Sequence, residues 1–236
     1  RFGSRPLVVQ IWHMVGMRST WLLATAVAST FRIPGRSWNG APADPGSLGP
    51  WGYMVMQGSS AVLVDPPFYS DDLAAEVRRF APRGVSHILL THDDFVRMSN
   101  HARWKVAFPG AARVAYHTEC ASGSVEVELR GEGPWDIAGF RIDRVPGHSE
   151  GSLFFASTEH SVLFTGDSIG LWGGGATGFG AYCRFGRARQ AKSLRAYARE
   201  APFCKVLLPG HGSPASFENK QQRLSFFETA ASGLER

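Results

Sequence analysis

Four short segments of the chain each carry a histidine or an aspartate that could bind a metal, and three of them place it beside glycine. Zinc and ferrous iron both accept imidazole and carboxylate ligands, and glycine lets the backbone turn sharply enough for ligands to converge. A structural histidine normally occurs alone, so a series of such segments favours a shared metal site. The segments are Thr-His-Asp-Asp at 91–94, Pro-Gly-His-Ser at 146–149, Thr-Gly-Asp-Ser at 165–168 and Pro-Gly-His-Gly at 209–212.

These segments are expected to follow strands. The apolar run 85–90 contains one histidine and is typical of a buried central strand, which would deliver 91–94 at its carboxyl end. Active sites of α/β proteins usually lie at such ends. We predict further strands at 21–31, 53–57, 61–65, 113–116, 125–129, 140–145, 152–156, 161–164 and 205–208, helices at 70–80, 188–199 and 217–232, and loops at 31–51 and 166–180.

In order and spacing the four segments resemble the metallo-β-lactamase superfamily, which includes the glyoxalase II thioesterases and the persulfide dioxygenases. In that family a strand ends in Thr-His-x-His-x-Asp-His, a later Gly-His completes the first metal site, Gly-Asp bridges two metals and Pro-Gly-His completes the second site. His92, His148, Asp167 and His211 match these positions. The resemblance implies an α/β fold of the metallo-β-lactamase type, an αβ/βα four-layer sandwich, with these residues as metal ligands.

The first segment departs from the family motif. Asp94 stands where the second histidine is expected, Val96 where the aspartate is expected, and Arg97 where the last histidine is expected. A guanidinium stays protonated and offers no lone pair, so Arg97 in this register would repel a second cation. We therefore predict at most one metal ion, zinc or iron. The candidate metal ligands are His92, Asp94, His148, Asp167 and His211.

Two interpretations of the altered motif stay open. The sequence from Thr91 to Trp104 also resembles a little-characterised Thr-His-x-Asp-Asp subgroup from photosynthetic organisms, in which a later Asp-His could restore the second site through His101. Alternatively, one ferrous ion binds two histidines and one carboxylate, as in the persulfide dioxygenases, and keeps open coordination positions. Asp94 as an added ligand would instead make a closed coordination site, which suits zinc. We expect residues 95–100 to begin a helix that carries His101 away from the metal.

Three functions follow from the resemblance. The preferred one is metal-dependent hydrolysis of a thioester or ester, in which Asp94 or Asp167 places or deprotonates the attacking water. The second is an iron-dependent persulfide dioxygenase. The third is of a different class: an inactive relic without metal, retained as a binding partner or subunit of an organellar assembly, because a fold can persist without its activity.

Other residues near these segments have simpler interpretations. His87 lies within the apolar run and is expected to be a strand-face imidazole. Asp93 is expected to orient a metal-binding histidine without binding the metal itself. Trp135, Trp172 and Phe179 either line a substrate pocket or serve packing alone.

Composition sets the remaining limits. A chain of 236 residues with 44% hydrophobic and 19% charged residues is predicted to form one globular domain over 1–236. The net charge is +5, and the basic residues are scattered along the sequence apart from a short arginine cluster at 184–189, which we interpret as a solvated face. No RNA-binding signature or zinc-finger spacing supports a nucleic-acid partner. The expected partner is a small-molecule substrate or a protein assembly.

The location is predicted from cysteine usage and from the N-terminal region. The three cysteines are far apart in sequence, which argues against a disulfide framework. The apolar stretch 21–31 is too short to span a membrane. Arginine far outnumbers lysine and the sequence starts without methionine, so we expect an organellar protein, from a plastid rather than a mitochondrion.

Overall fold

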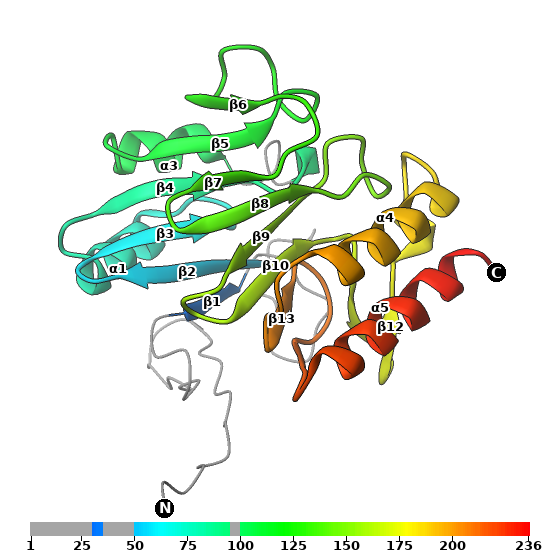
Figure 1. Ribbon diagram of the computed structural model, residues 1–236. Helices are drawn as coiled ribbons and strands as arrows, with labels where there is room; N and C mark the ends of the chain where they lie inside the picture. The colour runs from blue at the N-terminus through cyan, green and yellow to red at the C-terminus, as the bar shows by residue number, and fades with distance from the viewer. Residues whose placement is uncertain (1–29, 35–49, 95–99) are drawn as a thin grey trace, which may run out of the picture.

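Two six-stranded sheets face each other in the computed structural model, and helices cover the outer side of each (Figure 1). The structure describes residues 30–34, 50–94 and 100–236, without the side chains of 31–34. The first sheet and its helices comprise β1 (Thr30–Pro34), β2 (Trp51–Gln57), β3 (Ser60–Val64), α1 (Asp71–Phe80), β4 (Val85–Leu89), α3 (His101–Ala107), β5 (Ala112–Tyr116) and β6 (Val127–Leu129).

The second half of the chain forms the other sheet. Its elements are β7 (Trp135–Ile137), β8 (Phe140–Arg144), β9 (Leu153–Ser157), β10 (Val162–Gly166), β11 (Gly170–Trp172), β12 (Gly175–Thr177), the 3-10 turn η1 (Gly180–Tyr182), α4 (Arg187–Glu200), β13 (Val206–Pro209), β14 (Ala215–Ser216) and α5 (Lys220–Leu234). Strands β11 and β12 pair with each other as a separate hairpin.

The strand order explains where side chains can converge. The first sheet runs β1-β2-β3-β4-β5-β6, with β3 to β6 parallel, and the second runs β14-β13-β10-β9-β8-β7, with β10 and β13 parallel. Parallel strands bring their carboxyl ends to the same edge of a sheet. The segments that follow β4, β10 and β13 carry three of the four sequence motifs.

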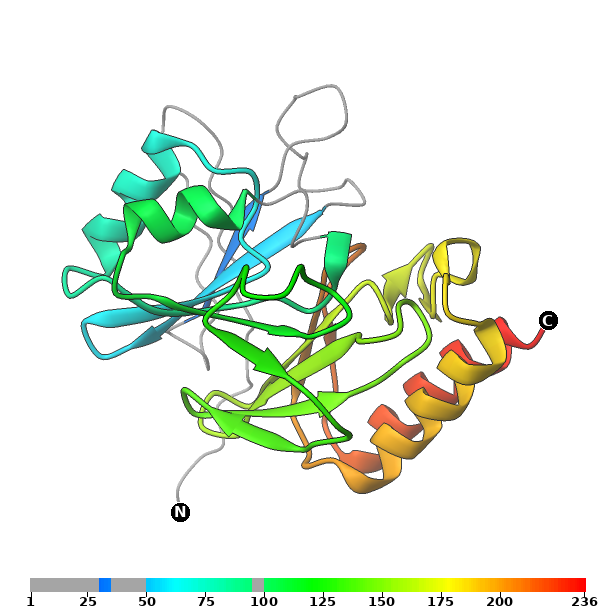
Figure 2. The same ribbon diagram turned by 90° about the horizontal axis from the view of Figure 1, so that it is seen from above.

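Three apolar clusters hold the layers together. One lies between the sheets and includes Tyr53, Val62, Phe155 and Phe164. A second packs α1 and α3 against the first sheet, and a third packs α4 and α5 against the second. The view from above shows the same order of layers, with the two helix pairs on opposite sides (Figure 2). The predicted α/β metallo-β-lactamase sandwich is therefore confirmed.

Local signals in the sequence account for the helix that starts the first layer. Ser70 caps α1, since its side chain accepts a hydrogen bond from the backbone N–H of Leu73 at 3.2 Å. Asp71 and Asp72 occupy the first turn, where carboxylates interact favourably with the helix dipole. The apolar positions Ala74 and Val77 face the sheet and are buried.

The structure corrects two expectations. The predicted loop 31–51 begins too early, because β1 extends to Pro34 and pairs with β2; the strand expected at 21–29 lies outside the described residues. The predicted loop 166–180 contains the β11–β12 hairpin, since Gly173 and Gly174 supply the positive φ angles that a tight turn requires. None of the described helices is long and apolar enough to cross a membrane.

Candidate metal centre

Four of the five predicted ligands converge at the carboxyl ends of the strands. His92, Asp94, His148 and Asp167 each offer one ligand atom, and these atoms all lie within 4.8 Å of one another. His92 and Asp94 follow β4, His148 lies in the turn between β8 and β9, and Asp167 follows β10. Residues from both sheets are thus brought to one point.

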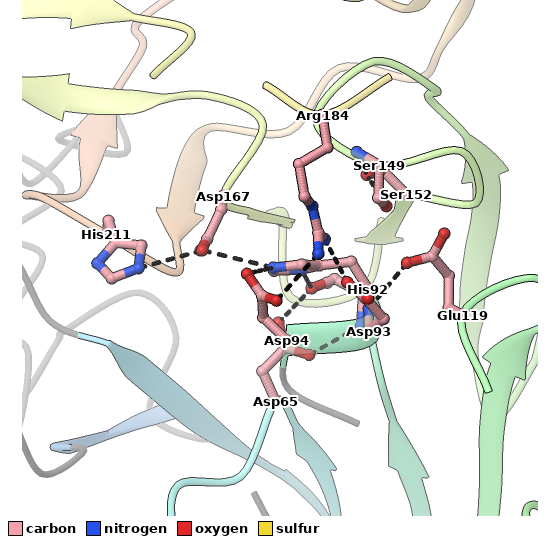
Figure 3. A network of polar contacts seen from close by, with 11 residues as sticks. Asp65, His92, Asp93, Asp94, Glu119, Ser149, Ser152, Asp167, Arg184 and His211 are labelled. Atoms are coloured by element: carbon pink, nitrogen blue, oxygen red, sulfur yellow. Dashed lines mark hydrogen bonds and ion pairs between the residues drawn. The ribbon is translucent and has the colours of Figure 1, made fainter. Parts of the chain in front are cut away.

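The two aspartates approach His92 from different sides (Figure 3). The Nε2 atom of His92 lies 3.4 Å from Oδ2 of Asp167 and 3.7 Å from Oδ2 of Asp94. The rings of His92 and His148 meet edge to face with centroids 4.6 Å apart. His92, His148 and Asp167 are buried, whereas the side chain of Asp94 is 40% exposed. The cluster therefore has three buried members and one that faces solvent.

Asp94 reaches the cluster through a helical turn and not from an extended strand end. An extended strand end would place side chains two residues apart on the same face. Strand β4 ends at Leu89, however, and Asp93 and Asp94 adopt helical backbone. The Asp94 carboxylate lies near His92 because the chain turns sharply after that histidine.

His211 lies beside the four-residue cluster and contacts it through Asp167. Its Nε2 atom is 3.1 Å from Oδ2 of Asp167, the same oxygen that faces His92. Its side chain is 31% exposed, and its ring lies 6.3 Å from that of Phe179. One carboxylate oxygen of Asp167 therefore links the two histidines.

The buried polar atoms of the cluster fit a metal ion. Among the described residues, both ring nitrogens of His148 and the Oδ1 atom of Asp167 are buried without a hydrogen-bond partner. Each buried polar atom left without a partner costs roughly 1–3 kcal/mol, unless another ligand satisfies it. Two imidazoles with carboxylates form a donor set that zinc and ferrous iron accept.

A buried threonine and a buried aspartate orient His92. The Thr91 hydroxyl donates to Oδ2 of Asp65 at 2.7 Å, and the Nδ1 atom of His92 lies 2.9 Å from the same hydroxyl. Since the hydroxyl proton goes to Asp65, Nδ1 is the donor in the second contact, which leaves Nε2 directed toward Asp94 and Asp167. We had assigned this orienting role to Asp93. The sequence signal that was missed is Asp65, which directly follows β3, a parallel neighbour of β4.

Glu119 joins two of the segments that carry ligands. It is buried, its Oε2 atom accepts the backbone N–H of Asp93 at 2.8 Å, and its Oε1 atom accepts that of Gly151 at 2.6 Å. The turn after β4 and the turn after His148 are thereby held together. Sequence analysis overlooked Glu119, although it follows β5, the next parallel strand in the sheet.

The positive charge beside the cluster comes from Arg184. Its Nη1 atom donates to Oδ1 of Asp94 at 3.2 Å, and its Nη2 atom donates to Oδ1 of Asp93 (Figure 3). The sequence predicts a solvated face for the arginines at 184–189, and the side chain of Arg184 is 40% exposed while it also binds the two aspartates. Arg97, the predicted source of positive charge, lies outside the described residues.

The charges of the cluster shift its pKa values in opposite directions. Burial, the largest single cause, disfavours a charged His92, but the carboxylates of Asp167, Asp94 and Asp65 together outweigh burial and raise the pKa of His92 to about 10. Burial and the charge of His92 lower the pKa of His148 to about 4. Burial opposes ionisation of Asp167, yet His211 and His92 hold its pKa well below the usual range. Without metal, a protonated His92 therefore lies between two carboxylates and His148 is neutral.

Two further histidines that were weighed as ligands lie away from the cluster. His87 is a half-buried residue of β4, and its Nδ1 atom contacts the Ser86 hydroxyl at 3.2 Å. His101 starts α3, and its Nδ1 atom accepts a hydrogen bond from Arg113 at 3.0 Å. Helix α3 begins at His101, and residues 95–99, where the sequence predicts that a helix begins, lie outside the described residues.

The three aromatic residues predicted to line a pocket or to serve packing lie in different surroundings. Trp135 lies in β7 against Tyr116, with ring centroids 6.3 Å apart, and packs on the core between the sheets. Trp172 is 47% exposed at the end of β11. Of the three aromatic residues weighed for a pocket, only Trp172 and Phe179 lie on the segment that follows Asp167.

Comparison with known proteins agrees with this geometry. The family model of the metallo-beta-lactamase superfamily matches residues 46–211, which is more than half of the chain. The chain belongs to the metallo-β-lactamase superfamily. No curated protein matches its sequence.

Solved structures of this superfamily share the fold at low sequence identity. A metallo-beta-lactamase from Pontibacter korlensis has a TM-score of 0.66 at 16% identity, over 89% of this chain and 96% of the other. The metallo-beta-lactamase FIM-1 from Pseudomonas aeruginosa, in its mono-zinc form, has a TM-score of 0.64 at 18% identity, over 86% and 91%. ETHE1 from Myxococcus xanthus has a TM-score of 0.60 at 17% identity, over 81% and 85%. These similarities are evidence for the fold alone.

Proposed function

We propose that the chain is a metal-dependent hydrolase with a mononuclear centre. The observation that carries the proposal is the convergence of His92, Asp94, His148 and Asp167, in which both ring nitrogens of His148 and the Oδ1 atom of Asp167 are buried without a hydrogen-bond partner among the described residues. His92, His148 and Asp167 would hold one zinc or iron ion. Bound there, the ion would lower the pKa of a water molecule and polarise a scissile carbonyl.

Asp94 is the best candidate for the proton acceptor. Its carboxylate is the most exposed of the four, and it lies farther from His92 than Asp167 does. In the metal-free chain the interaction with His92, whose Nε2 atom lies 3.7 Å away, is the main cause that lowers the pKa of Asp94, so the carboxylate is ionised at neutral pH. An ionised, solvent-facing carboxylate beside the ligands can accept a proton from water and pass it on.

The proposed substrate is a small thioester or ester. This class comes from analogy with hydrolases of the superfamily. The exposed side chains of Trp172 and Tyr182, on the same segment as Arg184, offer an apolar surface for such a molecule. The organellar location stays a prediction.

The test combines metal analysis with hydrolysis assays. Purified chain is expected to carry close to one zinc or iron ion and to hydrolyse model thioesters or esters, and chelation should abolish hydrolysis until metal is restored. His148→Ala should remove both metal and activity, whereas His87→Ala, a histidine outside the cluster, should keep both. A chain that binds metal but hydrolyses none of these substrates contradicts the proposal.

Two other functions have specific support. The buried triad of His92, His148 and Asp167 suits ferrous iron, and oxygen consumption with a persulfide would favour a dioxygenase. The guanidinium of Arg184 already neutralises part of the site's negative charge, as expected of a relic without metal. A native chain that purifies without zinc, iron or manganese, and takes up none, would favour the relic.

A further inference from the structure

Arg184 bridges two neighbouring carboxylates and leaves one oxygen of Asp94 for the metal cluster. Its guanidinium binds Oδ1 of Asp94, whereas the other oxygen, Oδ2, faces Nε2 of His92. It also binds Oδ1 of Asp93, whose position matches no ligand of the superfamily motif. A planar guanidinium holds carboxylates in a fixed geometry, so the side on which Asp94 meets a metal is determined by Arg184.

Backbone hydrogen bonds fix the main chain of Arg184 beside the cluster. The N–H of Arg184 donates to the carbonyl of His148 at 2.8 Å, and that of Phe185 donates to the carbonyl of Gly147 at 2.9 Å. The thiol of Cys183 donates to the same Gly147 carbonyl at 2.9 Å. Arg184 therefore contacts one ligand residue through its main chain and another through its side chain.

Carboxyl groups outnumber the positive charges near the cluster. Asp65, Asp93, Asp94, Glu119 and Asp167 all lie in its polar network, so one divalent ion leaves negative charge to be compensated. The guanidinium of Arg184 supplies positive charge directly at Asp93 and Asp94. Without it, Asp93 and Asp94 would present adjacent carboxylates to solvent, which divalent cations bind.

We infer that Arg184 is the built-in counter-cation of this centre: it directs one oxygen of Asp94 to a single metal ion and excludes a second divalent cation from Asp93 and Asp94. The inference rests on the proposed metal centre. According to this inference, the centre binds a single metal ion because of Arg184, a residue about 90 positions after the altered motif, and not only because ligands of the second site are lost.

The test is the zinc stoichiometry of variants, measured by calorimetric titration of metal-stripped chains with Zn²⁺ and by elemental analysis after desalting. The parent is expected to bind one ion, and Arg184→Gln is expected to bind two. Arg184→Gln combined with Asp93→Asn should return to one ion, because the added site then lacks a carboxylate. Arg130→Gln is the matched control, since Arg130 forms an exposed ion pair with Glu128 on another part of the surface.

The outcomes separate this inference from the proposed function. If Arg184→Gln binds one ion with the parent's affinity, the inference is overturned while the mononuclear centre stands. If the parent binds no ion and Arg184→Gln binds one, the proposed hydrolase fails but cation exclusion by Arg184 is supported. If neither chain binds zinc, both ideas fail.

A second variant covers the case in which Arg184→Gln does not fold, as judged by thermal unfolding. Arg184→Lys keeps the charge but cannot hold two carboxylates in one plane. Its stoichiometry should stay at one, and its zinc affinity should fall by about 10-fold as Asp94 loses its fixed orientation. An affinity equal to that of the parent would overturn the inference.

Discussion

Replacing Asp94 with alanine should weaken metal binding without removing it. The variant keeps the three buried donors and loses a carboxylate that is 40% exposed. Two unit charges about 4 Å apart interact by ~4 kcal/mol near a protein surface. Solvent screening reduces this value for an exposed group. We expect a loss of about 1.4–2.8 kcal/mol, which is a 10- to 100-fold weaker affinity.

The charge of Arg184 makes the loss of affinity larger than the missing carboxylate alone would make it. In the variant the guanidinium keeps Asp93 as a partner but no longer has Asp94 to neutralise it, so more positive charge faces the metal. The assay is competition for Zn²⁺ between the metal-stripped chain and a chromophoric chelator at constant ionic strength. High salt should narrow the difference between parent and variant.

His101→Ala is the control for this prediction. The imidazole of His101 contacts Arg113 at the start of α3 and belongs to no metal cluster among the described residues. Its replacement should leave zinc affinity unchanged. Equal affinity of Asp94→Ala and the parent, or a large loss with His101→Ala, would refute the assignment of Asp94 and favour a site that includes His101.

Three further predictions test the support of the centre. Thr91→Val removes the hydroxyl that orients His92 and should lower zinc affinity by about 10- to 100-fold in the same competition assay; an unchanged affinity would contradict that role. Gly210→Ala should also weaken binding, because the added Cβ would overlap Oδ1 of Asp167, whereas Gly110→Ala, in open space, should bind like the parent. The pKa of His92 is raised to about 10, against ~6.5 in an unfolded chain, so its contribution to stability is complete below pH ~6.5 and is lost as pH rises through about 10. The melting temperature of the metal-free chain should fall more steeply over this pH interval than that of the Asp167→Asn variant. If the melting temperatures of both chains fall in parallel with pH, Asp167 does not raise the pKa of His92.

The motifs predicted the fold and most of the cluster because ligands at strand ends leave a local signal. A histidine or aspartate after an apolar run, beside glycine, can be recognised without knowing its neighbours in space. Neighbouring glycine identified His148 and Asp167, the end of an apolar run identified His92, and the structure brings the three together. Neighbouring glycine also indicated His211, which contacts Asp167 but lies outside the four-residue cluster.

The residues that support the centre left a weaker signal. Asp65 and Glu119 are single acidic residues without a motif, and their roles depend on the parallel order of β3, β4 and β5. The order in which strands pair is set by long-range packing, which spacing along the chain does not specify. Both residues became recognisable only when the sheet placed them beside Thr91 and Asp93.

The sequence by itself determined which donors the centre could use, since residue type and strand-end position are local properties. The tertiary structure decided how those donors are used. It replaced the extended strand end assumed for Asp94 with a helical turn, and it placed the charge of Arg184 on the two carboxylates of that turn. Electrostatic interactions depend on distance in space and not on separation in sequence, so a partner some 90 residues away could not be read from the chain.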